Sequence, residues 1–119
     1  MKTLKLDHEL AALVQKGTKT STWRIFDDKN IQVGDTLQFV DKVDPDDVST
    51  WAEFGPAEVT DVIEKPLGEI TEADFTGHER FESPEKMLET YRNYYGSDVS
   101  LGTNIKIIHF KLLDQGRHG

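Results

Sequence analysis

Residues 17–24 read Gly-Thr-Lys-Thr-Ser-Thr-Trp-Arg, and this segment joins a predicted helix to a predicted strand. Before it, apolar positions recur at helical spacing over residues 10–14, and Gly17 is typical of the residue just past a helix end. Over residues 18–25, β-branched and aromatic side chains predict a turn followed by a strand. The segment therefore predicts a bend that carries a lysine directly before a strand.

Alternating apolar and polar residues predict further strands on both sides of this segment. Residues 3–6 alternate in this way, and Asp7 is placed to cap the helix that follows. The same pattern predicts strands over residues 36–42 and 57–64. Residues 105–113 are apolar on both faces, which favours a central strand that is covered on both sides.

The remaining connections predict one loop and two helical segments. Residues 43–56 are acidic and contain glycine and proline, so we expect a polar loop there. Residues 70–75 predict a single helical turn, and a helix is expected from Pro84, capped by Ser83 and ended by Gly96. Together these elements predict an α+β domain of about five to six strands, built as a small, strongly bent antiparallel sheet or barrel with two to three helices.

Length and composition limit the classes of protein to which the chain can belong. Its 119 residues fit one domain, which we expect to span residues 1–113, with residues 114–119 as a flexible tail. It has no cysteine, which excludes disulfides, thiolate zinc sites and a cysteine nucleophile. Its four histidines show no paired spacing, so we expect no metal and no other cofactor. No apolar run approaches the roughly 18 residues of a membrane span, and the first residues lack the apolar segment of a signal peptide. We therefore expect a cytoplasmic protein without a membrane partner.

The charge is negative overall but unevenly distributed. Lys and Arg number 14 against 22 Asp and Glu, which gives a net charge of −8 and disfavours an extended interface with duplex DNA. Residues 1–30 carry six basic and four acidic side chains, whereas residues 31–119 carry eight and eighteen. An electropositive surface near the start of the chain is compatible with this distribution.

The bend and the strand after it hold the first candidate site residues, Lys19, Thr22 and Arg24. A threonine hydroxyl attacks a carbonyl carbon only if a neighbouring base removes its proton. A lysine can serve as that base when burial or nearby cations lower the pKa of its amine. Because side chains alternate along a strand, Lys19 meets Thr22 only if the chain bends at Lys19 or Thr20. The alternative interpretation is an exposed strand face with good β-propensity.

Further candidates lie in the loop before the second helix and among the aromatic residues. Glu79 can act as a general acid or base, and the alternative is a solvated carboxylate in an acidic stretch. Phe81 and Trp23 can stack on a flat ligand, and the alternative is ordinary core packing. His78 shows no evident partner in the sequence and is interpreted as a surface or structural residue.

These motifs, taken together, resemble a known domain. The pattern consists of Gly17-x-Lys19-x-x-Thr22-x-Arg24, Ile31-x-x-Gly34-Asp35-x-Leu37-x-Phe39, Val59-x-x-Val62, Glu79-x-Phe81, a helix ending in tyrosine, and Ile107-x-x-Phe110-x-Leu112. Over residues 3–113 it is similar to the ASCH domain of the PUA-like superfamily. The resemblance implies a small β-barrel with a cleft between the barrel and the helices. Many members of the family have glycine after the loop glutamate, where Arg80 stands in this chain.

The resemblance implies one of two functions. Small bacterial ASCH proteins act as amidohydrolases on N(4)-acetylcytidine, and their catalytic lysine, threonine and glutamate correspond to Lys19, Thr22 and Glu79. Arg24, Phe81 and Trp23 are then expected to orient or bind the substrate, without a metal. The other function is binding of RNA or a nucleotide in the cleft without catalysis. The expected partner is therefore a small-molecule nucleoside or single-stranded RNA, and the oligomeric state is left open.

Overall fold

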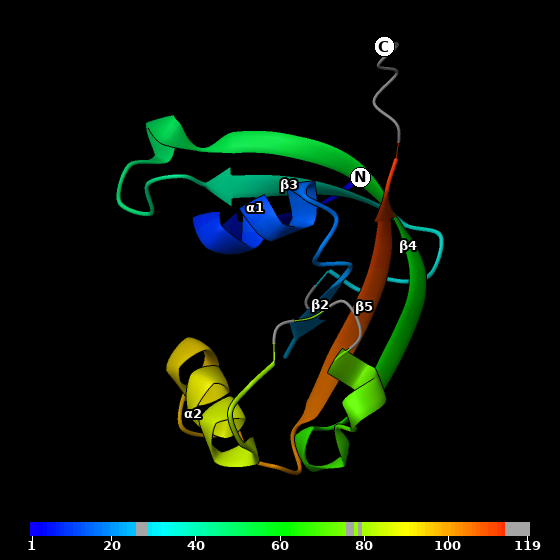
Figure 1. Cartoon of the computed structure of the whole chain (residues 1–119), viewed down its shortest axis with the longest axis vertical. Coiled ribbons are helices and arrows are strands. Elements are labelled where there is room, and N and C mark those ends of the chain that lie inside the picture. Colours follow the sequence, from blue (N-terminus) through cyan, green and yellow to red (C-terminus); the bar gives the residue numbers. More distant parts are fainter. Residues whose placement is uncertain (26–28, 76–77, 79, 114–119) are drawn as a thin grey trace.

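The computed structural model describes residues 1–25, 29–75, 78 and 80–113. The described residues form five strands, two α-helices and three short 3-10 helices (Figure 1). The strands are β1 (Lys2–Asp7), β2 (Ser21–Arg24), β3 (Thr36–Lys42), β4 (Ala52–Pro66) and β5 (Asn104–Leu112). The helices are α1 (His8–Gln15), α2 (Pro84–Tyr95), η1 (Val48–Thr50), η2 (Leu67–Glu69) and η3 (Glu72–Phe75).

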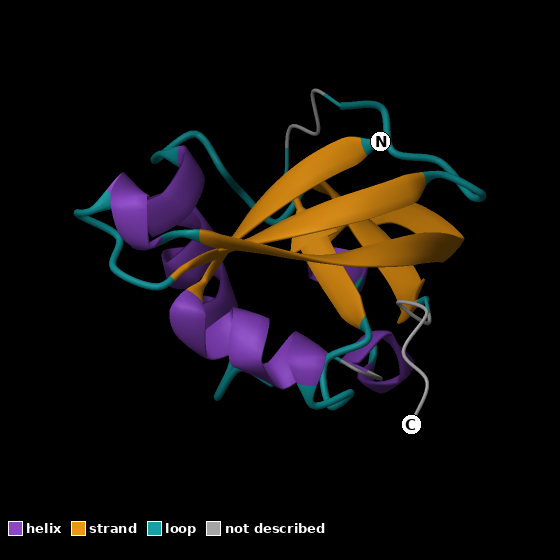
Figure 2. Ribbon diagram, turned by 90° about the horizontal axis from the view of Figure 1, so that it is seen from above, coloured by secondary structure: helices purple, strands orange, loops and turns teal. Residues whose placement is uncertain are grey.

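The strands form one curled sheet in the order β1-β3-β4-β5-β2, an open half-barrel (Figure 2). The prediction of an α+β fold with a small bent sheet is confirmed, but the expected purely antiparallel pairing is wrong. β1 pairs with β3 in parallel, from Lys2 opposite Leu37 to Asp7 opposite Lys42. A parallel pair needs a long crossover connection, which α1 and β2 supply here. β1 and β2 are thereby left at the two edges of the sheet.

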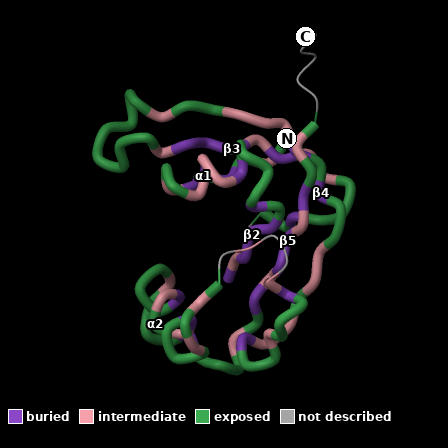
Figure 3. Tube along the Cα trace, viewed as in Figure 1, coloured by how far each residue is buried: buried purple, intermediate pink, exposed green. Residues whose placement is uncertain are grey.

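Two apolar clusters lie on opposite faces of β5. Ile108 and Phe110 pack into the cluster that contains α1, β1 and β3. Ile105 and Ile107 pack into the cluster that contains Trp23 and the buried side of α2. The predicted coverage of both faces of this strand is confirmed (Figure 3). Because apolar side chains alternate between its two faces, β5 can lie inside the sheet with one apolar cluster on each side.

The predicted loop over residues 43–56 is too long. β4 already begins at Ala52, and Phe54 pairs with Phe39 across the two strands with ring centroids 5.3 Å apart. Gly55 and Pro56 suggest a turn in the sequence, but they lie within β4 opposite a register shift in β3. Glycine and proline are tolerated inside strands at such irregular positions. The strand pairing with β3 therefore overrides the local turn signal.

The helix ends follow the sequence signals with one exception. Ser83 caps α2 by accepting a hydrogen bond from the Lys86 amide, and Gly96 lies just past its end with a φ of 108°. Asp7 occupies the N-cap position of α1, but its side chain makes no capping hydrogen bond. Its carboxylate instead lies 3.4 Å from the Lys42 amine and accepts a hydrogen bond of 3.5 Å from the Tyr94 hydroxyl. None of the helices in the described part of the chain has the length and apolar character needed to cross a membrane.

Asp74 fixes the position of η3 next to β4. Its buried carboxylate accepts hydrogen bonds from the Lys65 amine at 2.8 Å and from the Thr71 amide at 2.7 Å. Burial is the largest single influence and by itself raises the pKa of Asp74. The hydrogen bonds from Lys65 and Thr71 together outweigh it, and they hold the pKa below the usual value of 3.8. The charged carboxylate therefore stabilises the fold.

We expect Asp74→Asn to lower the free energy of unfolding at neutral pH by about 1–3 kcal/mol, because it removes a charged hydrogen-bond acceptor from a buried site. Because folding lowers the pKa of Asp74, its charged carboxylate stabilises the fold at pH values above the unfolded-state pKa near 3.9. This stabilisation is lost as the pH falls through the lower pKa of the folded state. Urea unfolding should show a difference in the free energy of unfolding between wild type and variant at pH 7, and this difference should shrink at pH 3 or below. An equal difference at both pH values would contradict this account.

Candidate functional site

A cavity of about 440 Å³ opens at the β2 edge of the sheet, between β1, β2 and α2. Its size lies within the range of small-molecule sites, roughly 300–1,000 Å³. Its basic lining residues are Lys5, Lys19, Arg24 and Lys42. Its aromatic lining residues are Trp23, His78, Phe81, Tyr91, Tyr94 and Tyr95. All the sequence-predicted site residues that the structure describes line this one cavity.

Lys19 and Thr22 lie on the buried side of the cavity. Only 3% of the Lys19 surface and 7% of the Thr22 surface are exposed, which is unusual for a lysine. β2 begins at Ser21, so the two-residue alternation of the strand does not extend back to Lys19. The chain therefore leaves the strand conformation where the sequence analysis required a bend, and both side chains reach the same cavity.

The end of α1 determines where Lys19 lies. Gly17 has a φ of 83°, and its amide donates to the Val14 carbonyl at 3.0 Å. The amides of Thr18 and Lys19 both donate to the Leu13 carbonyl, at 3.0 and 3.1 Å. This is the Schellman arrangement, in which a left-handed residue satisfies the free carbonyls of the last helical turn. Lys19 is thus attached through its backbone to α1 and enters β2 two residues later.

Aromatic side chains form the wall of the cavity beside α2. The His78 ring stacks on Trp23 with centroids 4.2 Å apart and an angle of 17° between the planes. Phe81 lies 6.2 Å from Trp23 and 5.9 Å from Tyr91. Trp23 is thus a partner of His78 that the sequence did not reveal, and the stacking agrees with the interpretation of His78 as a structural residue. Its contact with Trp23 joins segments more than 50 residues apart, so no local pattern could reveal it.

Glu79, the third expected catalytic residue, lies outside the described residues. Its neighbour His78 and the nearby Phe81 both line the cavity. Arg80, which stands where many ASCH proteins have glycine, makes an exposed ion pair of 2.5 Å with Glu72 and lies over the Phe75 ring. Among the described residues, no group of three or more His, Asp or Glu side chains could hold a metal ion.

Strand β2 contains several buried polar atoms that lack a hydrogen bond. Within the described part of the chain these atoms are Ser21 Oγ, Trp23 Nε1 and Arg24 Nε. Each such atom costs stability, and most buried polar groups in folded proteins have a partner. Departures of this kind are expected at functional sites, where the sequence is constrained by more than stability. Two of the three residues, Trp23 and Arg24, line the cavity.

The charge of the cavity is opposite to that of the chain. Four basic side chains and a single carboxylate, Asp7, line it among the described residues, a net of +3 on a chain of net charge −8. Lys5 and Lys42 were not predicted from the sequence, because they lie on β1 and β3, far from the Gly17 motif. The electropositive surface expected near the start of the chain thus corresponds to the cavity lining.

Several solved structures have an architecture similar to that of this chain. Protein EF3133 from Enterococcus faecalis V583, of the family DUF984, superposes with a TM-score of 0.72 at 15% identity, over 94% of this chain and 75% of its own. The hypothetical protein PH0355 gives 0.66 at 18% identity, over 95% and 100%. The ASCH domain from Lactobacillus crispatus JV V101 gives 0.64 at 16% identity, over 93% and 79%. The chain has the ASCH fold. No family model and no curated protein matches its sequence.

The ASCH fold explains why the cavity lies where it does. The sheet stops at β2, which pairs only with β5 among the described strands, so its outer edge is open. Side chains from both faces of an edge strand can reach the same space, and Thr22 and Trp23 do so here. The solved structures at 13–18% identity share this architecture with the chain, and the chemistry follows from the cavity's own residues.

We expect Gly17→Ala to destabilise the protein by about 1–2 kcal/mol, because alanine resists the left-handed conformation that the end of α1 requires. A Cβ at Gly17 would meet no atom within 4 Å, so the cost comes from the backbone. Gly102→Ala is a matched control, since its Cβ would make only an ordinary contact of 3.7 Å with Ser100 Oγ and no left-handed φ is involved. Equal melting temperatures for the two variants would contradict the role given to Gly17.

Proposed function

We propose that this ASCH domain is an amidohydrolase that removes an acyl group from the exocyclic amine of a modified cytidine nucleoside. One observation carries the proposal: Lys19 and Thr22 are both buried and both line the same cavity. A buried hydroxyl and a buried amine that line one cavity are the two groups that nucleophilic acyl transfer needs. The ASCH fold supports this choice because small bacterial ASCH proteins carry out this reaction with residues of these types.

The first half of the reaction transfers the acyl group to the enzyme. The Thr22 Oγ1 attacks the acyl carbon and forms a C–O bond, while the neutral amine of Lys19 takes the hydroxyl proton. The resulting ammonium stabilises the oxyanion of the tetrahedral intermediate. The C–N bond then breaks, and the departing 4-amino group takes a proton from the ammonium. The products at this stage are cytidine and an ester on Thr22.

The second half of the reaction restores the enzyme. Water attacks the ester carbon, and Lys19 again accepts the proton and returns it to the Thr22 oxygen as the C–O bond breaks. A carboxylic acid leaves and threonine is regenerated. In this proposal Glu79 relays these protons between Lys19 and the departing amine or the attacking water. That role is supported by the resemblance to ASCH amidohydrolases and by the position of its neighbours His78 and Phe81 on the cavity wall.

The aromatic wall suits the planar base of this substrate. The faces of Trp23 and Phe81 offer apolar surface on which a pyrimidine can stack. Arg24 follows Thr22 at the spacing of one strand face and lines the same cavity, so we assign its guanidinium to orienting the substrate or Glu79. A stacked base holds its exocyclic amide in a fixed direction, which is the main requirement for attack by a positioned hydroxyl.

A second candidate function is binding of RNA or a nucleotide without catalysis. The four basic side chains in the cavity favour it, because a neutral nucleoside does not need them. Turnover separates the two functions, since a binding module would retain the ligand without cleaving it.

We expect the purified protein to deacetylate N(4)-acetylcytidine, and we expect Thr22→Val and Lys19→Met each to lower kcat by roughly 10²–10⁴-fold. Both variants keep the shape of the side chain and remove its reactive group. Thr22→Ser restores a hydroxyl and serves as the matched control, which should retain measurable turnover. Product formation can be followed by liquid chromatography.

A second readout distinguishes a nucleophile from a residue with a structural role. Rapid quenching followed by peptide mass spectrometry should detect the acyl group on the peptide that contains Thr22, and no adduct should form in Thr22→Val. The proposal fails if the wild-type protein shows no turnover, or if Thr22→Val turns over substrate at the wild-type rate.

A further inference from the structure

Two further lysines of the cavity lining are more exposed to solvent than the buried Lys19 and Thr22. Lys5 belongs to β1 and Lys42 is the last residue of β3, and the two strands are hydrogen-bonded neighbours. Both lysines line the same cavity as the proposed catalytic pair. We refer to Lys5 and Lys42 as the rim lysines.

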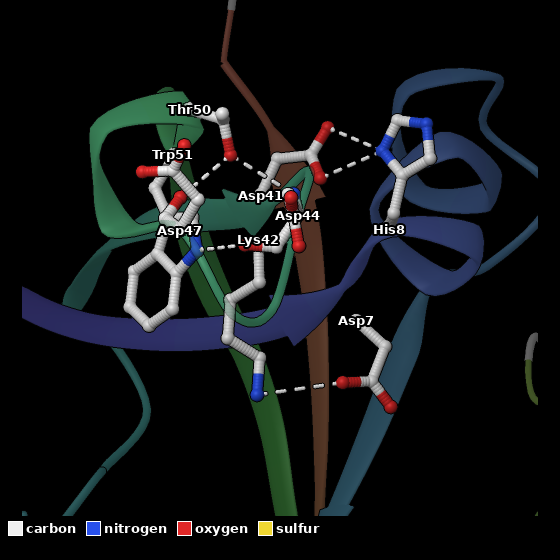
Figure 4. Close-up of polar contacts among 8 residues, drawn as sticks. All are labelled: Asp7, His8, Asp41, Lys42, Asp44, Asp47, Thr50 and Trp51. Carbon is white, nitrogen blue, oxygen red and sulfur yellow. Dashed lines mark hydrogen bonds and ion pairs between the residues drawn. The ribbon is translucent and has the colours of Figure 1, made fainter.

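The rim lysines are held together by one aromatic ring. The Lys5 amine lies 5.5 Å from the centre of the Trp51 ring, and the Lys42 amine lies 6.0 Å from it. Figure 4 shows Lys42 beside this ring with its amine directed toward Asp7. A cation over an aromatic face is attracted to it, most strongly for tryptophan. Both ammonium groups therefore lie against the same Trp51 ring, and both lysines belong to the cavity lining.

The loop that carries Trp51 is ordered by its own hydrogen bonds. The indole Nε1 of Trp51 donates to the Asp44 carbonyl at 2.8 Å, and the Asp44 amide donates to the Thr50 hydroxyl at 2.9 Å. Asp47 caps η1 by accepting from the Ser49 amide at 3.1 Å. These contacts, most of which Figure 4 draws, fix the ring before any ligand arrives. A site that is ordered in advance loses less conformational entropy on binding.

The positive charge of the rim is not fully compensated by the protein. Asp7 lies 3.4 Å from the Lys42 amine, while Lys5 forms no ion pair with a carboxylate in the described part of the chain. Two neighbouring ammonium groups repel each other unless an anion lies between them. On a chain of net charge −8, two lysines of a cavity lining that share a single carboxylate indicate an anionic group on the ligand.

We propose that the rim lysines bind the phosphate of a phosphorylated cytidine whose base lies on the buried side of the cavity. The inference rests on the proposed function and specifies its substrate class: a 5′-monophosphate or a residue of a short single strand, in preference to the free nucleoside. The acidic remainder of the surface disfavours long polyanions, but it does not oppose one phosphate at this mouth. A cavity of about 440 Å³ holds a base, a sugar and a phosphate.

The test compares N(4)-acetylcytidine with its 5′-monophosphate as substrates of the full-length protein. We expect KM to be roughly tenfold lower for the monophosphate in 50 mM salt, and this advantage should shrink in 500 mM salt. In the double variant Lys5→Gln/Lys42→Gln, the ratio of the two KM values should fall to about one. Lys111→Gln changes an exposed lysine outside the cavity and should leave the ratio at its wild-type value.

A third substrate identifies the source of the phosphate. A single-stranded trinucleotide with N(4)-acetylcytidine at its centre carries phosphodiesters instead of a terminal phosphate. A lower KM for either phosphorylated substrate that is lost in the double variant supports the rim site. The substrate with the lower KM shows whether a terminal phosphate or a phosphodiester is bound. Equal KM values for all three substrates in the wild-type protein, or an advantage that persists in the double variant, would overturn the inference.

Binding without turnover separates this inference from the proposed function. Calorimetric titration with cytidine 5′-monophosphate and with cytidine measures the phosphate contribution directly. Selective binding of the monophosphate that is lost in the double variant, together with absent hydrolysis, would reject the amidohydrolase and retain the rim site. Hydrolysis of the nucleoside without any preference for phosphate would retain the amidohydrolase and reject the rim site.

Discussion

The alternation of apolar side chains along β5 is the constraint on which the rest of the structure depends. Ile108 and Phe110 complete one core, and Ile105 and Ile107 complete the other. A strand with only one apolar face could not hold α1 and α2 on different sides of the same sheet. Because β5 separates the two cores, β2 can attach to its outer edge and remain open toward α2. The cavity occupies this opening.

The cavity combines features that each oppose stability. It buries a lysine, leaves polar atoms of β2 without hydrogen bonds and gathers four basic side chains on an acidic protein. The unpaired polar atoms and the gathered like charges each cost free energy. Their occurrence together in one place is more readily explained by recognition of a polar ligand than by folding. The aromatic wall around Trp23 then supplies the apolar contacts that a planar ligand needs.

The sequence predicted most of the elements, because their signals are local. The glycines at the ends of α1 and α2, the Ser83 cap and the alternation along β3 each act within a few residues. The errors arose where distant segments decide the outcome. The parallel pairing of β1 depends on β3, and the extension of β4 through Gly55 depends on the same strand.

The same distinction applies to the candidate site. Lys19, Thr22, Trp23 and Arg24 could be predicted because one short motif contains them. Phe81 could be predicted because it is an aromatic residue beside the candidate Glu79. Lys5, Lys42 and His78 reach the cavity from other elements, so only the three-dimensional structure brings them together with the motif. Glu79 lies outside the described residues, and its role stays a prediction.

The pairing of β2 with β5 also has a consequence for how the protein is made. Ser21 lies opposite His109, so the strand that carries Thr22 finds its partner almost ninety residues later in the chain. Contacts of such long range form slowly, and a ribosome releases the N-terminal part of a chain first. The nascent chain must therefore carry β2 unpaired until β5 has been synthesised, and the cavity beside β2 is complete only then.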